Sequence, residues 1–572
     1  MPRHVTAIHS EARRPAGTGA RPGTRRRVLL ALFLFTWVAA SCSRSDETAL
    51  PHAPGAAAPS HRVLVIGWDG ATFRTIDPLL AAGRMPNLAR LIERGVTSRL
   101  ESTRIPISSA AWPALTTGTS PGQTGVYSFF EAVPDSLDVR LVSAESVQQP
   151  PIWRLLSANG KRSHVFGVPI TYPPEEIRGT LAAGMLSPLD SQWATPPEWA
   201  ATLKERGLVP DLGAWRGRQR LSEARIDKQL ALKESALIEL LERDGWSLAW
   251  FVFKELDVLS HRAYDGGTTG PVPRLLEAID ATLGRLLAVA EREGAPPTDV
   301  LVLSDHGFDT YARSFNLHPW MYHEGFSVIN GPIESVDVGA SDGEGLAERR
   351  ADIHRRRMEQ LELSMTRAIA GPCEGNFGSI RLRVAGRDHG GVVAFEAMAE
   401  LLDEIEARLR ELLTPDYLDP LVKNVWRTAD LYPGDHLDLL PDLVFELDER
   451  WQCRADLDLR LFANHEPPVP DHDLWGVFVA AGPSFAHGTE RTERGLFDVT
   501  PLVLHLLGEA VEDEMDGKVP LELLTGAAKE RPVRSIARAS DQRRMPARRT
   551  LDHAPGDSDE VRERLGDIGY TR

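Results

Sequence analysis

Three short apolar runs, each followed closely by a carboxylate, constrain the fold of this chain most. The runs occupy residues 62–67, 247–253 and 299–304. The carboxylates are Asp69, Asp257 and Asp305. Continuous apolar runs of this length are typical of strands buried on both faces of a parallel sheet. Stretches with helical periodicity, such as 275–289, separate them, so we predict an α/β fold with a mostly parallel central sheet and helices on both faces.

The same pattern suggests how the chain is divided. Apolar runs at 443–445 and 476–481 and a helical stretch at 499–507 extend the core towards residue 525. Between 310 and 395 the periodicity weakens, which indicates an insertion that caps the core. The predicted parts are a first core segment at 61–309, the insertion at 310–395, a second core segment at 396–525 and a tail at 526–572.

The N-terminal segment is typical of an export signal. Three arginines at 25–27 precede an apolar run at 28–40, and a run of about 13 residues is shorter than the roughly 20 that a bilayer crossing needs. Residues 39–42 resemble a bacterial lipobox, in which Cys42 would become the lipidated first residue. We expect a signal peptide at 1–41 and a flexible tether at 42–60, rich in Ser, Ala, Pro and Gly.

This interpretation predicts an exported protein of the bacterial cell envelope, in the periplasm or on the outer surface, anchored to the membrane through lipid. An uncleaved anchor helix and a signal peptide without lipidation remain alternatives. The basic residues before the apolar run fit either the general or the twin-arginine export route.

Charge and cysteine content narrow the function further. The formal net charge is -16, although the first 41 residues carry seven Arg, no Lys and one Glu. The remainder is therefore strongly acidic and has no basic stripe of the kind that binds nucleic acid.

Three cysteines cannot build a disulfide scaffold. Beyond Cys42, Cys373 and Cys453 could form a disulfide in an oxidising compartment or remain thiols, since spacing cannot decide geometry.

Carboxylates and imidazoles gather at the predicted carboxyl ends of the strands, where open α/β sheets bind ligands. The candidate metal ligands are Asp69, Asp257, His261, Asp305, His306 and His472. Mixed carboxylate and imidazole ligation favours Zn²⁺, with Mn²⁺ or Fe as alternatives. Six ligands are too many for one tetrahedral ion, so we expect two divalent ions.

A segment rich in small and hydroxyl residues, 106–125, carries the candidate nucleophile. A serine at a helix N-terminus lies close to free N–H groups that also favour a bound phosphate. A neighbouring metal ion would turn such a hydroxyl into a nucleophile. An ordinary helix-capping serine is the alternative that the segment alone leaves open.

Several motifs occur in an order that resembles the alkaline phosphatase superfamily, in particular its type I phosphodiesterase/nucleotide pyrophosphatase branch. They are Gly67-Trp-Asp-Gly70, Met85-Pro-Asn-Leu88, Ser108-Ser-Ala-Ala-Trp-Pro with Thr116-Thr-Gly118, Asp257 with His261, Ser304-Asp-His-Gly307, and His472 with Gly482-Pro483. The resemblance spans about 62–520. Its later segments are similar to bacterial and archaeal proteins described as phosphohydrolases or phosphomutases.

The resemblance implies an alkaline-phosphatase-like three-layer sandwich with an inserted cap, and a two-metal site that hydrolyses a small phosphoester. One ion would be held by Asp69, Asp305, His306 and the nucleophile. The other would be held by Asp257, His261 and His472. In this branch the nucleophile stands nine residues before the threonine of the Thr-Gly pair, which gives Ser108, with Ser109 as its rival.

Other functions on the same fold are a phosphomonoesterase and a phospho-transferase or mutase. A phosphomonoesterase of this superfamily usually holds a third metal ion and an arginine for the free phosphate oxygens, and neither is apparent here. A sulfatase would need Cys or Ser followed by x-Pro-x-Arg, which the serine segment lacks. A surface binding lipoprotein without activity is the alternative outside the enzymes. The oligomeric state is not predicted.

Overall fold

The computed structural model describes residues 59–133, 136–212, 222–330, 360–455, 460–488 and 490–537. They belong to one compact unit, which begins at residue 53. The predicted signal peptide, Cys42, most of the tether and the tail from 538 lie outside the described residues. Among the helices that are described, none is both long and apolar enough to cross a bilayer.

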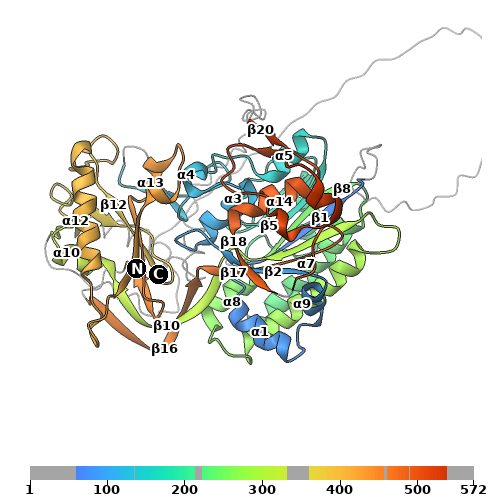
Figure 1. The fold of residues 1–572 in the computed structure, drawn as a ribbon, viewed down its shortest axis with the longest axis horizontal. Coiled ribbons are helices and arrows are strands. Elements are labelled where there is room, and N and C mark those ends of the chain that lie inside the picture. The colour runs from blue at the N-terminus through green and yellow to red at the C-terminus, as the bar shows by residue number, and fades with distance from the viewer. Residues whose placement is uncertain are drawn as a thin grey trace, which may run out of the picture. The chain divides into compact units, whose positions relative to one another are not determined.

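A nine-stranded sheet forms the centre of the unit (Figure 1). Its order is β18 (Arg491–Gly495), β2 (Gly95–Glu101), β17 (Trp475–Ala481), β9 (Thr298–Leu303), β1 (Arg62–Trp68), β8 (Trp246–Phe253), β5 (Arg162–Val168), β6 (Gly179–Ala183) and β7 (Ala194–Thr195). The three predicted runs are the adjacent parallel strands β9, β1 and β8, and every residue in them is buried. Only β17 and β7 pair antiparallel with their neighbours, so the predicted α/β class with a mostly parallel sheet is confirmed.

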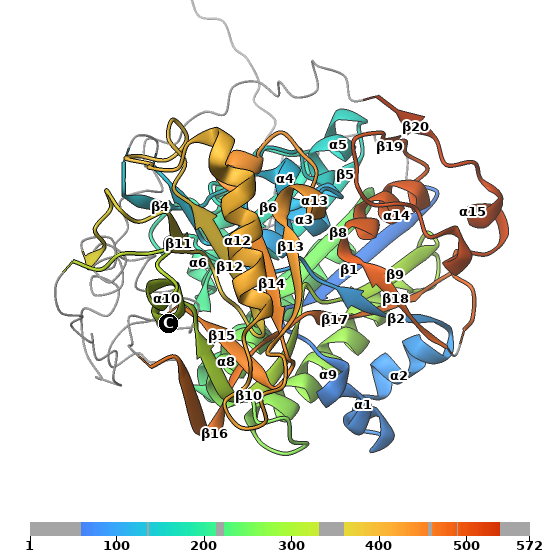
Figure 2. The ribbon, with the colours of Figure 1, turned by 60° about the vertical axis from the view of Figure 1, so that its left-hand side comes forward.

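Helices cover both faces of this sheet. Figures 1 and 2 show α3 (Ser108–Thr117), α5 (Ile152–Ala158) and α14 (Val499–Leu506) on one side. On the other side lie α1 (Phe73–Ala81), α2 (Pro86–Glu93), α7 (Glu223–Glu242) and α9 (Pro271–Ala290). The apolar residues of α9 that repeat at helical spacing are buried, as the periodicity predicts.

One buried carboxylate of α9 has a purely structural role. Asp280 accepts hydrogen bonds from the backbone N–H of Leu88 at 2.8 Å and of Asn87 at 3.1 Å, in the first turn of α2. These N–H groups have no partner within their own helix, so the carboxylate stabilises the helix start.

Two smaller sheets lie beside the central one. The first has the order β15 (Trp451–Arg454), β10 (Gly307–Asn316) and β16 (Phe462–Asp473). The second has the order β11 (Ala368–Ala370), β12 (Phe377–Leu382), β14 (Leu443–Leu447) and β13 (Val422–Arg427). Helix α12 (Met398–Arg410) packs its buried leucines and isoleucine into the core of these sheets. Figure 2 shows this helix lying along the strands of the second sheet.

This arrangement differs from the predicted division, which limited the insertion to 310–395 and assigned 396–525 to the main core. Helix α12 and strands β13, β14 and β15 all pack with the insertion. Periodicity shows that a helix has an apolar face, but it does not show which of two sheets that face covers.

The remaining described elements are short. The helices are α4 (Pro121–Thr124), α6 (Pro197–Glu205), α8 (Glu255–Ala263), α10 (Leu317–His323), α13 (Thr428–Leu431) and α15 (Gly526–Glu530). The strands are β3 (Phe130–Ala132), β4 (Val139–Leu141), β19 (Val511–Glu512) and β20 (Ser535–Ile536). Of these, α8 carries residues of the candidate site.

Candidate active site

The carboxyl ends of the three central strands deliver the three predicted carboxylates to one place. Asp69 follows β1, Asp257 lies in the first turn of α8 just after β8, and Asp305 follows β9. All three have no exposed surface. His261 lies one helical turn after Asp257, and His306 directly follows Asp305. Because β9, β1 and β8 are parallel neighbours, these side chains meet at the same edge of the sheet.

Two glycines shape the loop that carries Asp69. A Cβ on Gly67 would lie 2.4 Å from the ring of Trp112, so only glycine lets that indole pack against β1. In this position the Trp112 Nε1–H donates a 2.7 Å hydrogen bond to Asp69 Oδ2. Gly70 has a φ of 71°, which favours glycine, and its N–H donates to Asp305 Oδ1 at 3.4 Å. The loop therefore orients two candidate ligands at once.

The sixth predicted ligand, His472, arrives from the smaller sheets. It lies near the end of β16, which pairs antiparallel with β10 so that His472 is opposite Phe308. The sequence indicated His472 only as a residue before the strand at 476–481. In the structure β16 runs back from the insertion and continues almost directly into β17. The insertion thus contributes directly to the site.

The candidate ligands form two groups that share one imidazole. Asp69, Asp305 and His306 are the first group, and Asp257, His306 and His472 are the second. In the first, His306 Nε2 lies 3.4 Å from Asp305 Oδ2 and 3.7 Å from Asp69 Oδ1.

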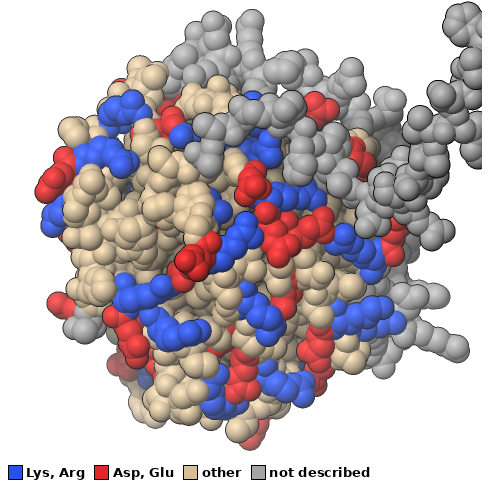
Figure 3. All heavy atoms as spheres, turned by 90° about the vertical axis from the view of Figure 1, so that its right-hand side faces the viewer, with Lys and Arg blue, Asp and Glu red and all other residues tan. Residues whose placement is uncertain are grey.

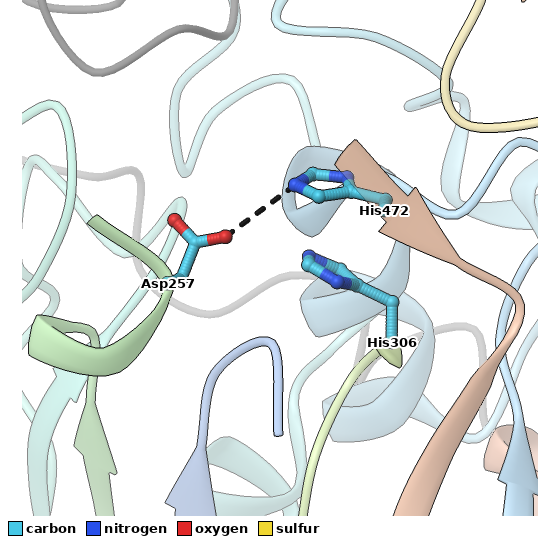
Figure 4. Close-up of side chains that lie close together, drawn as sticks. All are labelled: Asp257, His306 and His472. Atoms are coloured by element: carbon cyan, nitrogen blue, oxygen red, sulfur yellow. Dashed lines mark ion pairs between the residues drawn. The ribbon is translucent and has the colours of Figure 1, made fainter. Parts of the chain in front are cut away.

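In the second group the side chains converge from three elements (Figure 4). The distance from His472 Nε2 to Asp257 Oδ1 is 3.4 Å, and the rings of His306 and His472 stack with centroids 3.8 Å apart. His261 also points to this group, because its Nε2 lies 3.0 Å from His472 Nε2 and 3.4 Å from Asp257 Oδ1. All six predicted ligands are therefore brought together.

Backbone carbonyls orient two of the imidazoles. His472 Nδ1 lies 2.7 Å from the carbonyl oxygen of Pro106, and His306 Nδ1 lies 3.0 Å from that of Gly307. With Nδ1–H donating to the carbonyl, each ring presents the lone pair of Nε2 to the carboxylates, as metal-ligating histidines do.

The electrostatics of the site fit the binding of cations. Burial, followed by the charge of Asp305, raises the pKa of Asp69 to about 7. Burial also raises the pKa of Asp305. The pKa of His472 falls to about 3 because of burial and the neighbouring His306, which leaves a neutral imidazole. Among the described residues, Asp257 Oδ1 and Asp305 Oδ2 are buried without a hydrogen bond. Crowded carboxylates with unused oxygens and the neutral imidazole of His472 are donors that divalent ions require.

Ser108 points into this cluster. It is the first residue of α3, and its Oγ–H donates to Asp69 Oδ1 at 3.3 Å while Oγ lies 3.1 Å from His306 Nε2. The Oγ of the rival, Ser109, is buried and makes no hydrogen bond within the described part of the chain. Of the two serines, Ser108 therefore has the contacts that a nucleophile at this site needs.

Three charged residues of the site were missed by the sequence analysis. Lys254, at the end of β8, donates to Asp257 Oδ2 at 2.7 Å, and its Nζ lies 3.3 Å from both Asp69 Oδ1 and Ser108 Oγ. Its place directly after an apolar run was the signal that could have identified it. Glu374 and Asp471 surround the other side of His472, and Glu374 Oε2 lies 3.7 Å from His472 Nδ1. No motif indicated Glu374, which a turn of the insertion supplies.

The two described cysteines lie side by side at this turn. Their sulfur atoms are 3.3 Å apart, and both are thiols in the structure. Cys453 is buried on β15, and Cys373 is half-buried and immediately precedes Glu374. Both outcomes that the sequence left open, a thiol pair and a disulfide, are therefore compatible with their positions.

The charges on one face of the molecule are mixed. On the face that Figure 3 shows, basic and acidic side chains alternate, and the described residues of that face form no continuous basic stripe. Ion pairs between partly exposed side chains of the described residues include Arg94 with Glu291 and Arg285 with Glu234.

Comparisons with known proteins bear on the family and the fold. Residues 63–468 match the family model described as type I phosphodiesterase/nucleotide pyrophosphatase. No curated protein matches the chain. Among solved structures, phosphonoacetate hydrolase from Sinorhizobium meliloti 1021, in complex with phosphonoacetate, is similar with a TM-score of 0.51 and 16% identity, over 79% of this chain and 96% of that one.

A second similar structure is murine ectonucleotide pyrophosphatase/phosphodiesterase 5 in complex with AMP. It has a TM-score of 0.47 and 14% identity, over 81% of this chain and 100% of that one. The family match covers most of the chain, including five of the six candidate ligands and both serines. The chain therefore belongs to the type I phosphodiesterase/nucleotide pyrophosphatase family of the alkaline phosphatase superfamily, a family of phosphoester hydrolases.

Proposed function

We propose that this protein is a metal-dependent phosphoric ester hydrolase with a serine nucleophile, acting on a phosphodiester or pyrophosphate bond or, as the second candidate, on a phosphomonoester. The observation that carries the proposal is the position of Ser108 Oγ. It lies at the start of a helix, within hydrogen-bond distance of Asp69 and His306, in the middle of six buried candidate ligands. A serine that only caps a helix would need none of these neighbours.

Two divalent ions fit the residues present. Asp69, Asp305, His306 and Ser108 would hold one of them, and Asp257, His261 and His472 the other. Zn²⁺ suits this ligand set best, and Mn²⁺ or Fe are the alternatives. When bound, the ions supply charge stabilisation for the attacking and leaving oxygens of an in-line displacement.

The chain's own residues account for two displacements. In the first, Ser108 Oγ bonds to phosphorus while the bond from phosphorus to the leaving oxygen breaks. The serine gives up its proton to water, and the leaving oxygen takes one from water. In the second, water attacks the phosphoserine, the Oγ–P bond breaks, and Oγ regains a proton. Because Ser108 begins α3, the positive end of the helix dipole favours the phosphoryl charge. An alcohol in place of water in the second step would make the same site a transferase.

A substrate assay with metal removal tests the proposal. The full-length protein should hydrolyse bis(p-nitrophenyl) phosphate after incubation with Zn²⁺, Mn²⁺ or Fe²⁺. Exhaustive chelation should abolish the hydrolysis, and adding back the metal ion should restore it. Full activity in metal-free buffer after chelation would reject the proposal.

The location of the enzyme is a separate part of the proposal. Export and a lipid anchor at Cys42 are supported by the basic flank, the short apolar run and the lipobox-like residues 39–42. A phosphoester hydrolase in the cell envelope would act on small substrates outside the cytoplasm.

A further inference from the structure

Lys254 places a buried positive charge next to the proposed nucleophile. It is the N-cap residue of α8, directly after β8, and only 7% of its surface is exposed. Its ammonium group contacts Ser108 Oγ and carboxylates from both ligand groups, Asp69 and Asp257. Removing an ammonium from water is costly unless anions compensate, and these two carboxylates do so.

Lys233 is a second buried lysine near Lys254, and it makes different contacts. Lys233, on α7, packs close to the same strand end, but its Nζ pairs with Glu255 Oε1 at 2.5 Å and donates to the carbonyl of Val252 at 3.3 Å. Those contacts lie outside the candidate ligand set. Of these two buried lysines, only Lys254 contacts a ligand residue or Ser108 in the described part of the chain.

We propose that Lys254 is a substrate-binding residue that contacts a non-bridging oxygen of the phosphoryl group and makes the site prefer phosphomonoesters to phosphodiesters. This inference rests on the proposed phosphoric ester hydrolase function and specifies its substrate class. Lys254 would also supply the cation for the free phosphate oxygens, for which the sequence indicated no residue.

Geometry supports the contact. The phosphorus that Ser108 Oγ attacks must come within about 3.5 Å of that oxygen before the bond forms. A donor 3.3 Å from the same Oγ is then within reach of the oxygens attached to the phosphorus. Lys254 is therefore positioned to donate to the substrate without moving the backbone.

Charge supports the preference. The ammonium of Lys254 places one positive charge beside Ser108 in addition to the two divalent ions. The phosphoryl group of a monoester carries two negative charges near neutral pH, and that of a diester carries one. The ammonium therefore attracts the monoester more strongly, and in a buried site this difference is worth more than it is in water.

The test compares the two ester classes in variants of the full-length, metal-reconstituted protein. Lys254→Met removes the charge and keeps the length of the side chain, and Lys254→Arg keeps the charge. Lys233→Met is the matched control for loss of a buried lysine. For each protein kcat/KM is measured with p-nitrophenyl phosphate and with bis(p-nitrophenyl) phosphate. Calorimetry then gives the affinity for inorganic phosphate, which is independent of turnover.

We expect the parent to favour the monoester. Lys254→Met should lower kcat/KM for the monoester about tenfold or more beyond its effect on the diester, and weaken phosphate binding by a similar factor. Lys254→Arg should retain part of the preference. Lys233→Met should keep the parental ratio and phosphate affinity. If Lys254→Met does not fold by circular dichroism, Lys254→Gln serves in its place.

Three results would overturn the inference. They are a parent that favours the diester, a monoester-to-diester ratio that Lys254→Met leaves unchanged, and a variant that binds an additional metal ion per chain. An additional ion in Lys254→Met would mean that the ammonium of Lys254 occupies a metal site in the parent. A parent that hydrolyses neither ester with any metal would instead reject the proposed function, and the phosphate affinities would still report on Lys254.

Discussion

Ser108 Oγ lies 3.1 Å from His306 Nε2, although 198 residues separate them in the chain. The contact exists because His306 follows β9, the neighbour of β1, while α3 starts beside the loop after β1, where Trp112 reaches Asp69. The Oγ of the adjacent Ser109 makes no hydrogen bond within the described residues.

The first prediction follows from this difference. Ser108→Ala should lower kcat by at least about three orders of magnitude, because it removes the attacking oxygen. Ser109→Ala should retain most of the activity, since it removes a hydroxyl that makes no hydrogen bond in the described part of the chain. Steady-state assays compare the two, and acid quenching with peptide mass spectrometry should trap phosphate on Ser108. Full turnover in Ser108→Ala would transfer the role to another residue.

The second prediction concerns metal content. Apoprotein prepared by chelation should take up two Zn²⁺ per chain, measured by elemental analysis. The variants His472→Ala and Asp257→Asn should each retain only one Zn²⁺ per chain. Zn²⁺ binding to the folded state should raise the free energy of unfolding by about 2.7 kcal/mol at a Zn²⁺ concentration 100 times Kd. Asp280→Asn is the control, because this equally buried carboxylate caps α2 and should leave the metal content unchanged. Uptake of no metal by the parent would contradict the two-ion site.

The third prediction is that acid destabilises the folded state through His164, a buried histidine outside the candidate site. Burial, followed by the charges of Arg243 and Arg162, lowers the pKa of His164 to about 3. In the unfolded chain its pKa is about 6.5. The folded state therefore excludes a proton that the unfolded state binds, so this stability is present above pH 6.5 and is lost as the pH falls towards 3.

Denaturant unfolding at several pH values measures this effect. The neutral variant His164→Gln should lose less stability than the parent between pH 6.5 and 4, by up to about 1.4 kcal/mol per pH unit. The exposed histidine variant His323→Gln should follow the parent. Identical pH profiles for the parent and His164→Gln would contradict the prediction.

The fourth prediction concerns the cysteine pair. Two sulfurs 3.3 Å apart need only a small shift to reach the bonding distance of about 2.05 Å. Incubating the folded protein with oxidised glutathione should therefore link Cys373 to Cys453, with two hydrogens lost and two glutathione thiols released. Closing a loop between residues 80 positions apart should stabilise the fold by up to about 4 kcal/mol. Cys373→Ser should show no such gain, and two thiols still alkylatable after oxidation would exclude the link.

The fifth prediction tests the anchor. Protein expressed in a bacterial host with a lipoprotein export pathway should carry acyl chains on Cys42 as its first residue. Intact-mass spectrometry of the membrane fraction would detect them, and Cys42→Ser should release the protein from the membranes. A mature N-terminus elsewhere without acyl chains would contradict this interpretation.

Much of the candidate site was predictable because it depends on strand ends. A buried parallel strand is recognisable from a short apolar run, and the residue after it must lie at the same edge as those after its neighbours. From the sequence alone, that argument predicts that Asp69, Asp257 and Asp305 lie together. It could not place His472 on β16, because pairing between β10 and β16 depends on register between distant segments.

By itself, the sequence determined the fold class, the three central strands and the carboxylates at their ends, since local periodicity and strand direction are encoded in short segments. Only the tertiary structure decided which serine faces the ligands, where Lys254 directs its charge, which sheet α12 covers and that two cysteines meet. Each of these depends on contacts between residues far apart in the chain. Such contacts follow from packing and side-chain direction, which spacing along the sequence does not specify.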